Sequence, residues 1–188
     1  MSTAERPIPK ELELIRDFVN TRDLDPERDE ISEPSALAAW LSERGLLPKG
    51  ARATRAHVDQ AVELREALRT LLLAHNEDGI DTDAAAKAID RAARQTALEV
   101  RFNPDCTTDL VPAATGAAAA IGQLVAIVAD AAGTEEWSRL KACRRESCLW
   151  AFYDQARNRS RAWCSMEVCG NREKARSFRA RHATSISN

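Results

Sequence analysis

Four cysteines close to the C-terminus constrain this chain more than any other feature. Four residues separate Cys143 from Cys148, four separate Cys164 from Cys169, and fifteen lie between the two pairs. Each pair can span a tight turn, so that four thiolates converge on one tetrahedral ion, an arrangement that zinc favours. The same thiols could instead form two disulfides. The spacing therefore predicts either a zinc site or a disulfide framework.

The remaining sequence favours zinc. The first 30 residues lack the succession of basic, apolar and small residues that marks a secretory signal, and a reducing intracellular compartment leaves thiols free for metal. We therefore expect a cytoplasmic protein with one structural Zn²⁺ held by all four cysteines. The longest apolar stretch, residues 117–132, is interrupted by Gly122, Gln123 and Asp130, so we expect a soluble chain with no membrane partner.

Charge divides the 188 residues into two parts. Residues 141–188 hold eleven Lys or Arg and four Asp or Glu, whereas residues 1–140 hold sixteen and twenty-five. This asymmetry predicts a domain at 1–140 and a second at 141–188 that meet different partners, the basic one being suited to a polyanion such as DNA. The alternative is that the basic part only neutralises its acidic neighbour.

Apolar periodicity predicts an α+β fold with a predominantly helical N-terminal domain. Helical spacing recurs over residues 10–20, 34–45, 54–76, 83–92 and 115–133, while the charged residues 21–32 look like a loop. Leu98, Val100 and Phe102 alternate with polar residues, which predicts a half-buried strand. A turn after it leads to a second short strand near residues 109–111, so we expect a small β-hairpin.

The C-terminal part is expected to be a treble-clef-like zinc module, with a knuckle, a hairpin, a second knuckle and a helix in that order. Leu149–Tyr153 and Arg161–Cys164 look like two short strands joined by the polar segment Asp154–Ser160. The module has few apolar residues, so metal binding would supply much of its folding energy. Gly170 suits a turn with positive φ, and Asn171 suits a helix cap.

Two stretches of sequence resemble known families. The string from Trp163 to Arg176, with Cys169-Gly-Asn-Arg172 at its centre, resembles the CGNR zinc-finger family, and the upstream residues 150–161 fit the same pattern. Asp17-Phe-Val-Asn-Thr21 looks like the hallmark of the ABATE domain, which precedes that zinc finger in bacterial proteins regarded as stress-induced transcription regulators. Leu149 departs from the pattern, because a glycine is usual there.

The resemblance implies a zinc-containing transcription regulator whose C-terminal module contacts DNA. Arginine offers a planar fork that matches phosphate and guanine. The candidate DNA contacts are Arg157, Arg159, Arg161, Arg172, Lys174, Arg176, Arg179 and Arg181. Alternatively, these residues form a solvated charged surface, and the protein is a zinc-stabilised protein- or RNA-interaction module without sequence-specific DNA binding.

The N-terminal domain would sense a ligand or mediate assembly, and a homodimer is one possible form. Asp17 and Asn20 are three residues apart near a helix end. They could contact a small ligand, although capping or a buried hydrogen bond would also explain them. Cys106 stands alone, the histidines are scattered, and no phosphate loop or nucleophile elbow is present. We therefore do not expect an enzyme.

Overall fold

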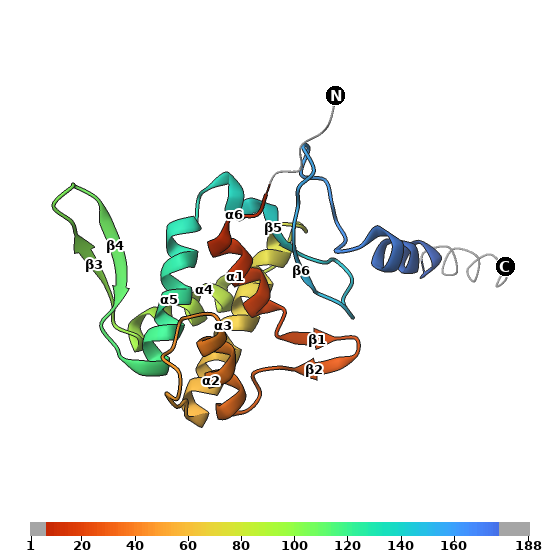
Figure 1. Ribbon diagram of the computed structural model, residues 1–188. Coiled ribbons are helices and arrows are strands. Elements are labelled where there is room, and N and C mark those ends of the chain that lie inside the picture. The colour runs from red at the N-terminus through yellow and green to blue at the C-terminus, as the bar shows by residue number, and fades with distance from the viewer. Residues whose placement is uncertain (1–6, 177–188) are drawn as a thin grey trace, which may run out of the picture.

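The computed structural model describes residues 7–176 (Figure 1). Its helices are α1 (Lys10–Val19), α2 (Pro34–Glu43), α3 (Arg55–Ala74), α4 (Asp83–Gln95), α5 (Gly116–Ala131) and α6 (Glu135–Arg139). Its strands form three antiparallel pairs, β1 (Arg22–Leu24) with β2 (Glu27–Asp29), β3 (Leu98–Phe102) with β4 (Thr108–Pro112), and β5 (Leu140–Ala142) with β6 (Ala151–Tyr153). The predicted α+β class is confirmed.

The helices begin and end where the local sequence directs them. Thr54 caps α3, since its hydroxyl accepts from the His57 amide at 3.4 Å while the His57 ring accepts from the Thr54 amide at 3.1 Å. Gly45 follows α2 with φ of 72°, a conformation that glycine adopts without strain. Each helix then buries one apolar face in a common core; on α1 that face is Leu12, Ile15, Phe18 and Val19.

The sequence predicted a loop at residues 21–32. This prediction was wrong, because the segment contains the β1–β2 hairpin. Arg65 of α3 is only 2% exposed and holds this hairpin, donating to the two carboxylate oxygens of Asp29 at 2.8 and 2.9 Å. Burial works to raise the pKa of Asp29, but the bonds from Arg65 outweigh it and the pKa lies below its ordinary value. The strands are three residues long and charged, so no periodicity revealed them.

The β3–β4 hairpin is present as predicted but is not half-buried. It projects from the helical body (Figure 1), and Val100 and Phe102 are 57% and 81% exposed. The strands are in continuous register, from Leu98 opposite Pro112 to Phe102 opposite Thr108. Leu98, at the base of β3, packs partly against the core, but in the described part of the chain the apolar residues beyond it are not buried.

The C-terminal segment joins the core of the helical part. β5 lies before the first cysteine and pairs with β6, so the predicted strand at Arg161–Cys164 was wrong. Leu140 and Tyr153 belong to the same apolar cluster as α1 and α3. Residues on both sides of position 140 thus share one core, and autonomous folding of residues 1–140 stays a prediction. No helix in the described part is long and apolar enough to cross a membrane.

Candidate metal centre and basic surface

The four predicted cysteines converge on one point. The Sγ atoms of Cys143, Cys148, Cys164 and Cys169 all lie within 4.8 Å of one another. Two of the distances, Cys148 to Cys164 and Cys164 to Cys169, are 3.6 Å. Four thiolates about 2.3 Å from a tetrahedral zinc ion would be about 3.8 Å apart, whereas a disulfide requires about 2.05 Å. The donor set therefore fits a single zinc ion and not a pair of disulfides.

Two similar turns present the thiols. In the first turn, the amides of Cys148 and Leu149 both donate to the Arg145 carbonyl, at 2.8 and 3.0 Å. In the second, the amides of Cys169 and Gly170 both donate to the Ser165 carbonyl, at 3.0 and 3.1 Å. Because the backbone closes each turn by itself, the cysteine side chains remain available for a metal ion.

Leu149 adopts the conformation that explains why glycine is usual at this position. Its φ is 48°, in the left-handed region, and its carbonyl accepts from the Arg69 guanidinium at 3.0 Å. The first turn thus keeps its shape despite the side chain, at a cost in backbone strain.

The prediction that Gly170 adopts positive φ was wrong, because Gly170 is not among the residues with positive φ. A Cβ at this position would lie 2.5 Å from the sulfur of Met166, so the exposed Met166 side chain would have to shift for any larger residue. The helix cap is Ser165, whose hydroxyl accepts from the Val168 amide at 3.3 Å, and not Asn171. A π-helical turn, η1 (Met166–Gly170), follows the cap and leads into the helix at 171–176.

Crowding gives the thiols very different proton affinities. Hydrogen bonds from Cys148 and Cys164 lower the pKa of Cys143 to about 2. The hydrogen bond with Cys143 raises the pKa of Cys148 to about 12, and the bonds with Cys143 and Cys148 raise that of Cys164. One thiolate is stabilised by its neighbours and opposes the ionisation of a second. A bound divalent cation would offset this repulsion between thiolates.

Asn76 is a site residue that sequence reasoning missed. It is 5% exposed, and its side-chain amide donates to the carbonyls of Ala142 and Ala162 at 2.8 and 2.9 Å. These residues precede Cys143 and Cys164, so one amide fixes both cysteine-bearing segments to the end of α3. The sequence showed Asn76 only as part of a turn signal.

Two buried charges shape the loop between the cysteine pairs. Lys141 donates to the Asp154 carboxylate at 2.9 Å, and both side chains are almost fully buried. Asp154 also accepts from the backbone amides of Ala156 and Arg161, at 3.0 and 2.9 Å. The loop carrying Arg157 and Arg159 therefore rests on an internal ion pair, and neither member of that pair is accessible to a partner.

The residues predicted to contact DNA differ in their exposure and in their partners within the chain. Arg157 and Lys174 are exposed; Arg159 lies 3.3 Å from Glu135, and Arg176 lies 2.9 Å from Glu173. Arg161 donates to the carbonyls of Trp163 and Cys164 and lies over the Phe152 ring, so it also supports the second cysteine pair. Arg179 and Arg181 lie outside the described residues.

Asp25, in the β1–β2 turn, reaches across to the cysteine-bearing region. One of its carboxylate oxygens lies 3.1 Å from Arg145 and 3.0 Å from Arg172. The Arg145 guanidinium also lies 4.0 Å from the Cys169 sulfur. One carboxylate of the β1–β2 turn therefore pairs with two arginines beside the candidate metal centre and offsets part of their charge.

Asn20 is used structurally, as one of the alternatives anticipated. Its side chain accepts from the Ala151 amide at 2.7 Å and donates to the Ala151 carbonyl at 2.9 Å, which fixes β6 beside α1. Asp17 pairs with Arg16 at 2.8 Å. Both residues nevertheless line a cavity of about 520 Å³, together with Arg44 and Arg161.

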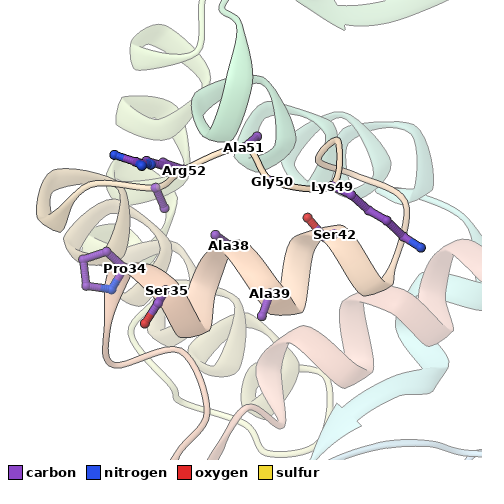
Figure 2. Close-up of a pocket in the computed structure, with 10 residues that line it drawn as sticks. Pro34, Ser35, Ala38, Ala39, Ser42, Lys49, Gly50, Ala51 and Arg52 are labelled. Atoms are coloured by element: carbon purple, nitrogen blue, oxygen red, sulfur yellow. The ribbon is translucent and has the colours of Figure 1, made fainter.

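A second cavity, of about 510 Å³, lies between α2 and the loop that follows it (Figure 2). Its walls are mostly small side chains such as Ala38, and Lys49 and Arg52 lie at opposite ends. None of the residues predicted from sequence lines it. Cys106 is exposed and apart from the other cysteines.

Comparison with known families agrees with this architecture. Residues 139–182 match the CGNR zinc finger, so the C-terminal module is a zinc finger with a structural zinc ion. Residues 12–135 match ABATE, described as "Putative stress-induced transcription regulator", and the chain belongs to this family. That description is of a regulator and not of an enzyme. No curated protein shows significant similarity to the chain.

Proposed function

We propose that this protein is a zinc-dependent transcription regulator of the stress response that binds DNA through its basic C-terminal surface. The observation that carries the proposal is a four-cysteine centre in a segment rich in arginine and lysine. Arg157 and Lys174 are exposed, and within the described residues no ionic partner occupies them. The loop that carries Arg157 is anchored by the buried Lys141–Asp154 pair, which reduces the entropy lost when a phosphate is bound.

The metal ligands of this proposal are Cys143, Cys148, Cys164 and Cys169, all as thiolates. Elemental analysis should find one zinc per chain, and Cys164→Ser should lose the metal. Cys106→Ser is the matched control, because its thiol is exposed and outside the cluster; it should keep full zinc content. Stoichiometric zinc in Cys164→Ser would show that the ligand set is wrong.

DNA binding is tested by fluorescence anisotropy of the zinc-loaded full chain over a salt series. If arginines and lysines neutralise phosphates, log affinity should fall linearly with log salt, by about 0.9 per contact. Arg157→Ala and Lys174→Ala should each lower the slope by about one contact, whereas Lys49→Ala, an exposed lysine on the α2 side, should not change it. Absence of binding at low salt would favour the protein- or RNA-interaction role instead.

The cavity at Asp17 and Asn20 is the place we propose for a ligand sensed by the helical part. Its polar lining combines arginines with carboxylates, which suits a small zwitterionic or anionic molecule. Arg161 and Cys164 also line it, so an occupant would touch the segment that carries the second cysteine pair. Asp17→Asn should then change the affinity for a small molecule bound in this cavity without changing the zinc content of the protein.

A further inference from the structure

The outer part of the β3–β4 hairpin carries an apolar face that the described residues leave open, whereas Leu98 at its base packs partly against the helical core. Leu98, Val100 and Phe102 lie on one face of β3, opposite Pro112, Leu110 and Thr108 of β4. Val100 and Phe102 are the most exposed large apolar side chains on this ribbon. A two-stranded ribbon of this kind is marginal in water by itself, and an unpaired edge invites a further strand.

The backbone of β3 has hydrogen-bonding groups at its free edge that can pair with a further strand. The amide of Asn103 donates to Thr107 at 2.9 Å, and the amide of Ala113 donates to Ala97 at 3.0 Å. Residues 97 and 103 are therefore bonded to β4, and in an antiparallel ladder residues 99 and 101 follow the same pattern. It follows that the N–H and C=O groups of Leu98, Val100 and Phe102 point to the free edge.

We propose that two copies of this chain pair through β3, edge to edge and antiparallel, about a two-fold axis at Val100. This register places Glu99 opposite Arg101 of the second copy, twice by symmetry. It also places Leu98 opposite Phe102 of the second copy. Apolar residues thus meet apolar ones on one face, and opposite charges meet on the other, so the strand is complementary to itself.

The same arrangement fails on β4, which identifies β3 as the pairing edge. A two-fold axis at Leu110 would place Asp109 opposite Val111 and Thr108 opposite Pro112, with no charge match. Pro112 has no N–H to donate, and β4 already contacts α5. The result of pairing through β3 is a four-stranded sheet that joins two helical bodies, which would give the N-terminal domain the assembly role expected from its sequence. Its test requires no DNA.

Light scattering after size exclusion of the zinc-loaded full chain should give twice the chain mass of 20.7 kDa at micromolar concentration. Arg101→Glu places carboxylates opposite each other, and Glu99→Arg places guanidinium groups opposite each other. Each variant alone should dimerise about tenfold more weakly or not at all. An equimolar mixture of the two restores both ion pairs across the interface and should recover the dimer.

Arg28→Glu is the matched control, because Arg28 is an exposed arginine on strand β2 of the β1–β2 hairpin. This variant should dimerise like the unmodified chain. Hydrogen exchange should protect the amides of Val100 and Phe102 only in the dimer. A chain that stays at 20.7 kDa overturns the proposal. So does a dimer in which the charge variants and their mixture behave alike, or in which these amides remain unprotected.

Discussion

Removing the Asn76 side chain should weaken the metal centre from a distance. In Asn76→Ala, the carbonyls of Ala142 and Ala162 lose donors at 2.8 and 2.9 Å. A buried acceptor left without its partner costs about 1–3 kcal/mol, so the two together cost about 3 kcal/mol. If this cost destabilises the zinc-bound arrangement of the cysteines, zinc affinity should decrease by roughly 100-fold, because about 1.4 kcal/mol corresponds to a factor of ten.

Competition with a chromophoric chelator measures the zinc affinity, and urea unfolding of the zinc-loaded chain measures the stability. Asn158→Ala provides the matched control, because the Asn158 side chain only accepts exposed bonds from Ser160; zinc affinity should be unchanged within about twofold. The reasoning is refuted if Asn76→Ala binds zinc as tightly as the unmodified chain. If stability falls without a change in zinc affinity, Asn76 supports the fold and does not position the cysteines.

Three further predictions concern other parts of the molecule. Asp25→Ala should free Arg172 for phosphate and steepen the salt dependence of DNA binding by about 0.9, as measured by anisotropy; an unchanged slope would show that Asp25 does not compete with DNA. Leu149→Gly should relieve left-handed strain and raise the free energy of unfolding by about 0.5 kcal/mol net of the entropy cost of glycine, which a higher urea midpoint would show; a lower midpoint would mean that the lost leucine contacts dominate. Burial lowers the pKa of His75 below 6.5, so the unfolded chain binds more protons there and stability should fall as pH drops from about 6.5 through the folded pKa. His75→Gln should remove that part of the acid sensitivity in urea titrations at several pH values, and an identical pH profile would contradict the assignment.

The sequence by itself determined the local elements and the metal donors. Helical spacing and caps such as Thr54 gave α1 to α5, because amphipathic periodicity is a property of neighbouring residues. The cysteine spacing indicated either one zinc centre or two disulfides, and the lack of a secretory signal favoured zinc. The resemblance carried by Cys169-Gly-Asn-Arg172 gave the family.

Only the tertiary structure decided which distant residues serve these elements. Arg65 fixes the β1–β2 hairpin from 36 residues away, and Asn76 holds backbone 66 and 86 residues further along the chain. No local pattern reveals such pairs, because each is a polar side chain that satisfies a buried backbone group or charge after the chain has folded.

Strand β3 also shows that a local sequence pattern does not determine tertiary contacts. Its alternation of apolar and polar residues predicted a half-buried strand, yet within the described residues Val100 and Phe102 meet solvent. Alternation states that one face is suited to burial but does not name the surface that buries it. Tertiary structure shows where burial within the described residues ends: the backbone turns at Ala97 with φ of 49°, and the strand leaves the helices beyond Leu98.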